Sequence, residues 1–328
     1  MKIDLTQALV LLNNNHVVAI PTETVYGLAA KFDSLAGIEK IYEIKNRPKN
    51  HPLIIHIGQK NPEVYLEALA VDIPPYVFKL IENFWPGPMT LILKKSNFVS
   101  EKITGGQTTV GIRMPNHPVA LTLIDQLGCP LVAPSANKYC ELSPTSLNDV
   151  ESALGHDIPV LEGGRCSVGI ESTIVSALNL HFVEILRPGL LTPDLLEKAA
   201  GVPCIDSRNN PTPIKTRVSG DQSVHYAPKK KLYLIRPDEI KNIKNFKKNI
   251  KNSFLIDLDQ TFFLLKKEVS NYLSMPLEPN AYAALIYQYL RMADQDLLSE
   301  FILLVIPPNQ PEWAGVLDRL NKAGEFLI

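Results

Sequence analysis

The sequence lacks the common loops that bind nucleotide phosphates. It contains neither a G-x-x-x-x-G-K-[ST] loop nor a G-x-G-x-x-G turn, and it has no G-x-S-x-G turn that would present a nucleophilic serine. No pair of side chains in it reads as a nucleophile with its base. Any nucleotide must therefore be held by a different device, and covalent catalysis is not favoured.

Spacings typical of metal sites, disulfides and membrane spans are also missing. The four cysteines are widely separated with no C-x-x-C pair, and the histidines show no H-x-x-x-H spacing. No apolar stretch reaches the length of a membrane span, and residues 1–7 carry an acid where a signal peptide would be basic or apolar. These absences predict a soluble, cytoplasmic, reduced protein with no metal site and no membrane contact.

An excess of basic charge is absent too. The 33 basic and 34 acidic residues leave a net charge of −1, whereas proteins that follow a nucleic-acid backbone usually carry a clear basic excess. One stretch does have lysines spaced for a single helical face: Lys241, Lys244, Lys247, Lys248 and Lys251. A solvated helix or a nucleic-acid docking face would each explain this stretch, and the solvated helix is favoured.

The length and the order of the expected elements indicate two α/β domains. The 328 residues exceed what one small core usually organises. In the first part, short apolar runs predict strands at 16–20, 53–57, 89–94, 110–114, 130–133, 172–176 and 183–186. Apolar residues at helical spacing predict helices at 4–14, 34–45, 75–83 and 119–127. This mixture is typical of an open α/β sheet.

A change in composition marks a linker. Residues 206–219 are rich in Asn, Pro and basic residues and hold almost nothing to bury. Beyond them, strands are predicted at 231–235, 254–258 and 301–306, and helices at 238–250, 279–293 and 311–323. We therefore predict a first domain at 1–205, a linker at 206–230 and a small α/β domain at 231–328.

Four polar segments follow or adjoin expected strands, and each also has a plain structural explanation. The first is Pro21-Thr22-Glu23-Thr24-Val25-Tyr26-Gly27, in which two threonines and a glutamate precede a glycine that can let the chain turn away. The alternative is a capping box that starts a helix, with Thr22 or Thr24 as the cap. From this segment alone, the two explanations are equally good.

The second segment is Lys45-Asn46-Arg47-Pro48, followed by His51 and His56. The residue before a proline is biased toward extended backbone, in which side chains two apart project to the same side. Lys45 and Arg47 would then converge, and a planar fork beside a point charge suits a triphosphate. A solvated basic turn is the alternative, and it is the more common case for an isolated K-x-R.

The third and fourth segments offer small hydroxyl and amide groups. Ala133-Pro134-Ser135-Ala136-Asn137, with Ser143-Pro144-Thr145 after it, has little bulk and follows an expected strand. Gly169-Ile170-Glu171-Ser172-Thr173-Ile174-Val175 lies shortly before Ile185-Leu186-Arg187-Pro188-Gly189. Ser, Asn and Pro also favour ordinary turns, and a β-bulge with a surface arginine would explain the last run equally plainly.

The basic residues of these segments, together with Arg113, share a position in the expected fold. Lys45, Arg47, Arg113 and Arg187 all lie near the ends of expected strands in one domain. The ends of strands are where α/β sheets usually bind their ligands. The sequence therefore predicts an anionic ligand at one edge of the first domain.

The first two hundred residues resemble the YrdC-like threonylcarbamoyl-AMP synthases. Each matching run is weak alone, but nine of them in order are specific. They are Pro21–Leu28, Lys45–Pro48, Pro52–Ile57, Trp85–Thr90, Val110–Pro118, Ala133–Asn137, Ser143–Thr145, Gly169–Val175 and Leu186–Gly189. In addition, His225-Tyr226-Ala227-Pro228 resembles the linker signature of the two-domain version, and residues 318–323 resemble its closing helix.

Three places depart from the family pattern. Residues 218–224 vary the usual approach to the linker signature, and Pro311-Glu312-Trp313-Ala314 stands where a glycine-rich turn is common. His51 stands where a small polar residue is usual. These departures leave open details of the second domain and one phosphate contact.

The resemblance implies a fold and a reaction. The fold would be an open, twisted mixed sheet with helices, joined by a long linker to a small Rossmann-like α/β domain. L-threonine, bicarbonate and ATP would give threonylcarbamoyl-AMP and pyrophosphate, and the product would feed transfer proteins that modify an adenosine beside the tRNA anticodon. Mg²⁺ with ATP is implied, with no organic cofactor, and tRNA would bind weakly at most.

The resemblance also implies the site residues. Those expected around threonine are Thr24, His56, Arg113, Ala133, and Ser172 or Thr173. Those expected to contact ATP are Arg47, His51, Thr109, Ser135, Asn137, Ser143, Arg187 and Tyr226. Lys45 and Arg47 are the expected catalytic residues.

These assignments fit the chemistry of the reaction. Arg113 can bind a carboxylate through two parallel hydrogen bonds. Lys45, Arg47 and Arg187 would offset charge on the phosphates and on the leaving pyrophosphate. No side chain is an unambiguous general base, which favours positioning and electrostatics over proton transfer by one residue. If Tyr226 contacts ATP, the linker is a lid over the cavity.

Two other functions stay open. A YrdC-like domain also takes part in carbamoyl transfer during hydrogenase maturation, but there it accompanies zinc-binding cysteine pairs that this sequence lacks. A non-catalytic RNA-binding module would use the positive concave face of the same fold. The near-zero net charge argues against that module.

Overall fold

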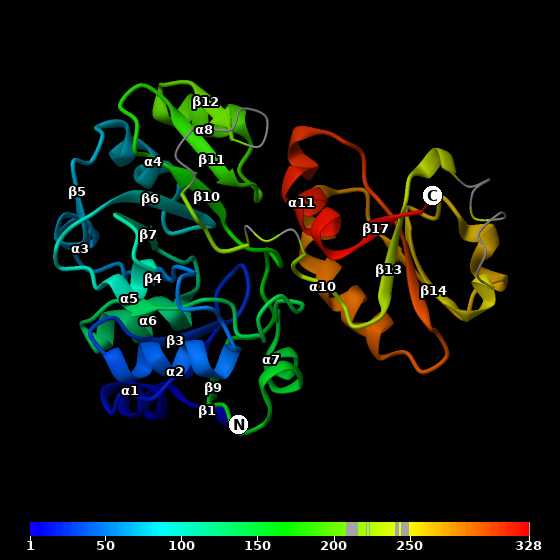
Figure 1. The fold of residues 1–328 in the computed structure, drawn as a ribbon, viewed down its shortest axis with the longest axis horizontal. Helices are drawn as coiled ribbons and strands as arrows, with labels where there is room; N and C mark the ends of the chain where they lie inside the picture. The colour runs from blue at the N-terminus through cyan, green and yellow to red at the C-terminus, as the bar shows by residue number, and fades with distance from the viewer. Residues whose placement is uncertain (208–215, 221, 223, 240–242, 244–248, 328) are drawn as a thin grey trace. The chain divides into compact units, whose positions relative to one another are not determined.

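The computed structural model describes residues 1–207, 216–220, 222, 224–239, 243 and 249–327 (Figure 1). The chain forms two compact units. Unit 1 consists of Met1–Tyr139, Ser143–Ser167 and Glu171–Asp221, and unit 2 of Cys140–Leu142, Val168–Ile170 and Gln222–Ile328. Four of the five lysines of the basic stretch, 241, 244, 247 and 248, lie outside the described residues.

Unit 1 is built on one large mixed sheet. Its described strands are β1 (Lys2–Ile3), β2 (Val18–Ile20), β3 (Gly27–Lys31), β4 (Ile54–His56), β5 (Ala70–Val71), β6 (Met89–Lys95), β7 (Thr109–Arg113), β8 (Leu131–Val132), β9 (Val160–Leu161), β10 (Thr173–Ser176), β11 (Val183–Arg187) and β12 (Cys204–Asp206). They pair in the order β1-β9-β2-β3-β8-β4-β7-β6-β10-β11-β12, with β5 beside β6. Parallel pairs such as β4 with β7 adjoin antiparallel pairs such as β6 with β7, so the expected mixed sheet is confirmed.

Helices accompany this sheet in unit 1. They are α1 (Leu5–Asn13), α2 (Leu35–Lys45), α3 (Pro62–Leu69), α4 (Tyr76–Phe84), α5 (Glu101–Thr104), α6 (Pro118–Leu127), α7 (Leu147–Leu154) and α8 (Pro193–Ala200). The first begins at a capping box, because Asp4 accepts from the Gln7 backbone N–H while the Gln7 side chain accepts from that of Asp4. The second begins at Ser34, whose hydroxyl accepts from the Gly37 N–H at 3.0 Å. The helices expected at 4–14 and 34–45 are confirmed.

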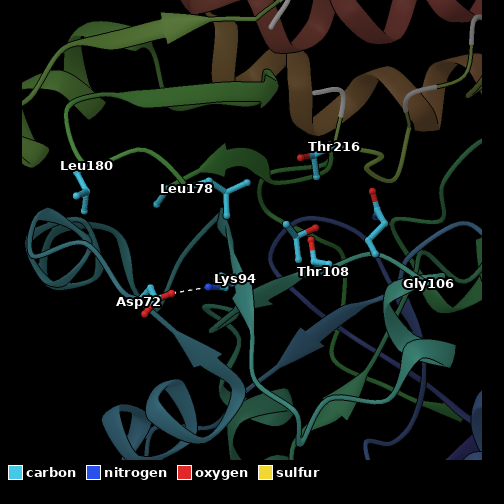
Figure 2. A pocket seen from close by; sticks show the side chains of 10 residues that line it. Asp72, Lys94, Gly106, Thr108, Leu178, Leu180 and Thr216 are labelled. Carbon is cyan, nitrogen blue, oxygen red and sulfur yellow. Dashed lines mark hydrogen bonds and ion pairs between the residues drawn. The ribbon is translucent and has the colours of Figure 1, made fainter. Parts of the chain in front are cut away.

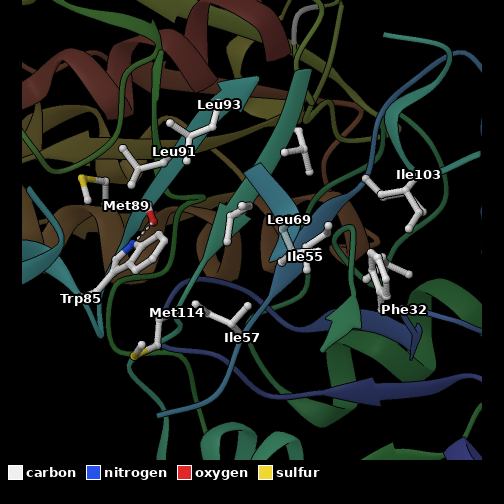
Figure 3. Packing of buried hydrophobic residues seen from close by; sticks show 14 of the residues in the cluster. Phe32, Ile55, Ile57, Leu69, Trp85, Met89, Leu91, Leu93, Ile103 and Met114 are labelled. Carbon is white, nitrogen blue, oxygen red and sulfur yellow. Dashed lines mark hydrogen bonds between the residues drawn. The ribbon is translucent and has the colours of Figure 1, made fainter. Parts of the chain in front are cut away.

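The two faces of the central strands differ in chemistry. On one face, Leu91 and Leu93 of β6 pack in the main hydrophobic cluster with Ile55 of β4 and with Trp85 and Met89, whose indole N–H and carbonyl are 2.8 Å apart (Figure 3). Side chains alternate between the faces along a strand. The opposite face therefore carries the other set, among them His56, Thr90 and Arg113. This polar face is where the candidate site lies.

Two local expectations in this unit are wrong. Gly27 does not turn the chain away but begins β3, and no helix follows Thr22 or Thr24, so the capping-box alternative fails as well. A Cβ on Gly27 would lie 3.1 Å from the Cβ of Ala133, so a close approach of two segments, rather than a turn, favours glycine there.

The extended geometry expected around Lys45 and Arg47 is also wrong. Lys45 is the last residue of α2, and Asn46 caps that helix in the left-handed conformation with φ 53°. Asparagine tolerates this conformation better than most residues. The two cations therefore leave a helix end in different directions instead of projecting side by side from a strand.

Unit 2 is a smaller α/β unit with a wholly parallel sheet. Its described strands are β13 (Lys231–Ile235), β14 (Ser253–Leu258), β15 (Asn271–Met275), β16 (Phe301–Val305) and β17 (Glu325–Phe326), in the order β15-β14-β16-β13-β17. Its described α-helices are α10 (Pro279–Gln295) and α11 (Ala314–Ala323). Short 3-10 helices occur at Pro237–Glu239, Ile250–Asn252, Phe263–Lys267 and Pro311–Trp313. A parallel sheet with helical connections is Rossmann-like, as expected.

The predicted elements of unit 2 are matched unevenly. The strands expected at 231–235, 254–258 and 301–306 are present, whereas β15 and β17 were not expected. Most of the helix expected at 238–250 lies outside the described residues. Within the described part of the chain, no helix is both long and apolar enough to cross a membrane. All four cysteines are free thiols.

Candidate active site

Arg113, at the end of β7, is the centre of one end of the site. Its side chain is 4% exposed. Nη1 donates to the Thr24 hydroxyl at 2.9 Å, Nε donates to the Gly87 carbonyl at 3.3 Å, and Nη2 lies 2.6 Å from Glu23 Oε1. The guanidinium is thus fixed on three sides by the loop that precedes β3 and by the turn before β6. We call these residues, together with His56, the threonine end, after the ligand that the resemblance leads us to expect there.

The hydroxyl groups of the loop form a directed chain. Thr22 donates to the Val25 carbonyl at 2.6 Å, which uses its only hydroxyl proton. In the 2.9 Å contact between Thr22 and Thr24, Thr24 is therefore the donor. Because Thr24 also accepts from Arg113, its hydroxyl is committed on both sides. Thr24 thus fixes the arginine more than it offers a free hydroxyl to a ligand.

His56, at the end of β4, is a neutral polar group at the same end. Burial, and secondarily the nearby charge of Arg113, lower its pKa to about 3. Nδ1 lies 3.2 Å from the Ile54 carbonyl, so in the neutral ring this nitrogen carries the proton and Nε2 keeps its lone pair. His56 can accept a hydrogen bond there without adding charge. The Ala133 N–H bonds to the same Ile54 carbonyl at 3.0 Å, which places Ala133 beside β4.

The register of β10 distinguishes Ser172 from Thr173, which the sequence alone could not do. Thr173 pairs with Met89 and so shares the apolar face, and its hydroxyl accepts from the Leu191 N–H at 3.1 Å. Ser172, one residue earlier, contacts the Thr90 hydroxyl at 2.7 Å and accepts from Arg187 Nη2 at 3.2 Å. The structure thus brings Ser172, and not Thr173, to the polar face.

Arg187, at the end of β11, is held mainly by carbonyl oxygens. Its Nη2 and Nε donate to the Ser172 carbonyl at 3.0 and 3.2 Å, and its Nη1 donates to the Ser219 carbonyl at 3.0 Å. The side chain is 4% exposed. A guanidinium has five N–H donors in a fixed planar fork, a geometry that suits an anionic ligand such as a phosphate.

Lys45 joins the helix end to the loop after β8. Its Nζ donates to the carbonyls of Ser135 and Asn137 at 2.6 and 2.5 Å. The side chain is 1% exposed. Ser135 and Asn137, two of the predicted ATP contacts, therefore bind Lys45 through their backbone carbonyls.

Arg47 completes a second cluster of cations. It donates to the Pro52 carbonyl at 2.9 Å and to the Ser219 hydroxyl at 3.1 Å, and it lies over the Tyr139 ring at 5.8 Å. The His51 ring packs edge-on against the same Tyr139 ring. We call the three cations Lys45, Arg47 and Arg187 the phosphate end, after the ligand that the resemblance leads us to expect there.

Two contacts of this region were not foreseen from the sequence. Ser143, a predicted ATP contact, donates to Glu171 Oε1 at 2.5 Å. Ser219 bonds to both Arg47 and Arg187, although it is 172 residues from Arg47 along the chain. In the sequence, Ser219 was marked only by its place in the predicted linker. A contact between residues so far apart along the chain leaves no local sequence pattern from which it could be predicted.

Thr109 lies away from the residues at the other end of its strand. It begins β7 and Arg113 ends it, a separation of about 13 Å along an extended strand. Thr109 lines a pocket of about 740 Å³, together with Lys94, Asp72, Leu178 and Thr216 among others (Figure 2). Thr109 is therefore separated from Arg113 by the length of β7, and its expected contact with ATP stays a prediction.

Tyr226 belongs to unit 2, where it is almost completely buried. It adopts a left-handed backbone with φ 59° and is 1% exposed. Arg319 lies over its ring at 5.2 Å, and the His225 ring is 3.9 Å from it. Its expected contact with ATP stays a prediction.

A resident metal has few ligands available. Among the residues that the structure describes, no group of three or more His, Cys, Asp or Glu side chains could hold a metal ion.

Comparison with known protein families shows to which family the chain belongs. A family model described as "Telomere recombination", named for Sua5, YciO and YrdC, matches residues 10–189. The chain belongs to the Sua5–YciO–YrdC family. A second model, "Threonylcarbamoyl-AMP synthase, C-terminal domain", matches residues 191–324 of this Sua5-family chain.

Individual relatives agree with that assignment. The threonylcarbamoyl-AMP synthase of Bacillus subtilis (strain 168) is 34% identical over 327 residues, covering 97% of this chain and 92% of the relative. That of Pyrococcus abyssi is 37% identical over 265 residues, 76% of each chain. The crystal structure of P. abyssi Sua5 complexed with L-threonine matches with a TM-score of 0.87 at 30% identity, covering 99% of both chains. The expected family and fold are confirmed.

Proposed function

We infer that this Sua5-family chain is a threonylcarbamoyl-AMP synthase, an enzyme that joins L-threonine, bicarbonate and ATP and releases pyrophosphate. The synthases of B. subtilis and P. abyssi are similar over most of their length. The observation that carries the inference within this structure is the three-sided fixation of Arg113 beside a polar sheet face.

The threonine end fits an amino acid. Arg113 retains N–H groups that can bind a carboxylate in parallel. His56 offers a neutral acceptor that a hydroxyl can meet. Thr24, Ala133 and Ser172 adjoin these groups, and we propose that they surround threonine, as P. abyssi Sua5 was crystallised with that amino acid.

The phosphate end fits the nucleotide. Lys45 and Arg47 come from the end of α2, whereas Arg187 comes from β11, so cations reach the site from separate elements. Fixed positive groups in a buried site stabilise charge that develops during phosphoryl transfer without reorganising. We propose that they offset charge on the phosphates as the threonine carbamate attacks the α-phosphorus and pyrophosphate leaves.

Other parts of the function are proposals of the same kind. Mg²⁺ would enter on the triphosphate and neutralise part of its charge, since the described residues form no carboxylate cage. His51, Thr109, Ser135, Asn137, Ser143 and Tyr226 are the proposed further ATP contacts, with no organic cofactor. The adenylate would pass to threonylcarbamoyl-transfer proteins that act on tRNA, with this chain binding tRNA weakly at most. Four free cysteines suit a reducing, cytoplasmic setting.

A direct assay tests the reaction. The full-length protein is incubated with ATP, Mg²⁺, L-threonine and labelled bicarbonate, and the products are pyrophosphate and a labelled adenylate. Omitting threonine should abolish the label in the nucleotide fraction. Absence of product from a folded protein would overturn the inference, and a preference for carbamoyl phosphate over bicarbonate would favour carbamoyl transfer instead.

A further inference from the structure

The threonine end contains a buried carboxylate to which the roles above assign nothing. Glu23 is 4% exposed, and its Oε1 lies 2.6 Å from Arg113 Nη2. Within the described residues, neither oxygen of Glu23 nor Nη2 of Arg113 makes a hydrogen bond of proper geometry. Charge attraction therefore holds the two groups together, while hydrogen-bonding capacity is left over on both.

The position of this carboxylate is fixed by the loop around it. The Thr22 hydroxyl accepts from the backbone N–H groups of Thr24 and Val25, each at 3.2 Å, and so sets the turn that contains Glu23. A buried carboxylate oxygen without a donor is costly, and in native proteins such a group calls for an explanation, a catalytic role or a bound partner among them. The loop thus fixes Glu23 beside Arg113 with accepting capacity that no donor of the described residues uses.

We propose that Glu23 and Arg113 together form a receptor for the zwitterion of the amino acid, with Arg113 binding the α-carboxylate and Glu23 accepting from the α-ammonium. Glu23 is thereby a substrate-binding residue that reads the amino group. The proposal rests on the proposed function and deepens it by assigning the second charged group of the substrate.

The balance of charge supports this arrangement. Glu23 and Arg113 sum to zero, and so does an amino-acid zwitterion, so that binding adds no net charge to a buried site. An acid without the ammonium would bring an uncompensated negative charge next to Glu23, which is unfavourable in a buried site. His56, which is neutral, does not change this balance.

The test compares two ligands on two proteins by calorimetry, with and without a non-hydrolysable ATP analogue. The ligands are L-threonine and the 2,3-dihydroxybutanoate of matching configuration, which keeps the carboxylate and the β-hydroxyl but replaces the ammonium by a hydroxyl. The wild type should bind threonine at least about tenfold more tightly, because a hydrogen bond to a charged group is at stake.

The variant Glu23→Gln should invert this preference. Threonine binding should weaken by about ten- to a hundredfold, whereas the dihydroxy acid should bind within about threefold of its wild-type affinity or more tightly. Glu82→Gln, which removes an exposed carboxylate of unit 1, is the matched control and should leave both affinities unchanged.

Several outcomes would overturn the proposal, and one of them is specific to the proposed function. Equal affinity of the wild type for the two ligands removes the ammonium-reading role even if the Gln variant fails to fold. An equal loss for both ligands in Glu23→Gln shows that Glu23 acts only by holding Arg113. Failure of the wild type to bind threonine under either condition instead removes the synthase function itself.

Discussion

The threonine end and the phosphate end both fix buried cations, but with different partners. At the threonine end, Arg113 meets an ionised side chain, Glu23, and a hydroxyl relay from Thr24 to Thr22. At the phosphate end, Lys45 donates to the backbone carbonyls of Ser135 and Asn137. The first arrangement places charges of both signs for one small ligand, and the second concentrates positive charge.

The difference shows how one fold separates recognition from charge compensation. A site with balanced charge discriminates among ligands by the position of each polar group, because every mismatch leaves a buried group unpaired. A site in which several buried cations are held in fixed positions suits an anion and stabilises negative charge that develops there. The two ends should therefore fail in different ways when their cations are removed.

The largest expected effect is at Arg113. The change Arg113→Met should raise the KM for threonine by on the order of a thousandfold, because it removes the carboxylate partner from a buried site. It should also lower the free energy of unfolding by about 3–5 kcal/mol, since Glu23 is left buried without its counter-ion. Steady-state kinetics and urea unfolding measure the two effects.

A double variant separates these two consequences. Adding Glu23→Gln to Arg113→Met removes the unpaired charge, so most of the lost stability should return while threonine binding stays absent. Arg236→Met is the control, because Arg236 forms an exposed ion pair with Glu239 at 3.0 Å and should cost less than about 1 kcal/mol. Recovery of threonine binding in the double variant would contradict the role of Arg113.

The next largest effect is expected at Lys45, at the other end. Lys45→Met should lower kcat by about a hundred- to a thousandfold, the usual loss for one fixed group that stabilises transition-state charge. Threonine affinity, measured without nucleotide, should stay within about twofold of the wild type. Lys40→Met changes an exposed lysine of the same helix and should leave kcat unchanged. A large loss of threonine affinity in Lys45→Met would show that the two ends are not separate.

A smaller effect distinguishes two neighbouring hydroxyls. Ser172→Ala should lower kcat/KM by about tenfold, because Arg187 and Thr90 each lose a partner at the polar face. Thr173→Val keeps the shape of the side chain but leaves the Leu191 N–H without its acceptor, so it should cost about 1–3 kcal/mol of stability. Equal kinetic losses in the two variants would contradict the assignment of faces.

The same pair shows what the sequence could and could not predict. Nine motifs in order located the strand ends that carry Arg113 and Arg187, because side-chain chemistry next to apolar runs is a local signal. The face of Ser172 could not be read, since a shift of one residue in strand register exchanges the faces. Register depends on pairing with β6, which lies more than 70 residues earlier in the chain.

Other misses have related causes. Lys45 is placed by the last turn of α2, and the left-handed cap at Asn46 redirects the chain before Arg47; the proline-based expectation of extended backbone included neither. β3 was missed because Gly27–Lys31 is short and rich in small residues, and its strand state comes from pairing with β2 and β8 on either side. The first miss is a local helix end, whereas in the second the tertiary partners of β3 outweighed its local preference.

The last effect, which develops only in acid and is absent at neutral pH, concerns the neutral state of His56. Its pKa is about 3 in the folded protein, below the ordinary value of 6.5, because burial disfavours the charged ring. As the pH falls below about 6.5, the His56 ring therefore binds a proton in the unfolded chain but not in the folded chain. Stability from this group is complete above that pH and falls as the pH drops from about 6.5 toward 3, by up to about 1.4 kcal/mol per pH unit.

The variant His56→Gln tests this at the threonine end alone. Its free energy of unfolding, from urea titrations at pH 8, 6.5, 5.5 and 4.5, should fall less steeply below pH 6.5 than that of the wild type, with a difference that grows on acidification. The comparison at pH 8, where the ring is neutral in both folded and unfolded chains, isolates the change in packing. Parallel curves for the two proteins would mean that His56 takes up its proton in the folded state, and the threonine end would then carry an extra positive charge that undoes its balance.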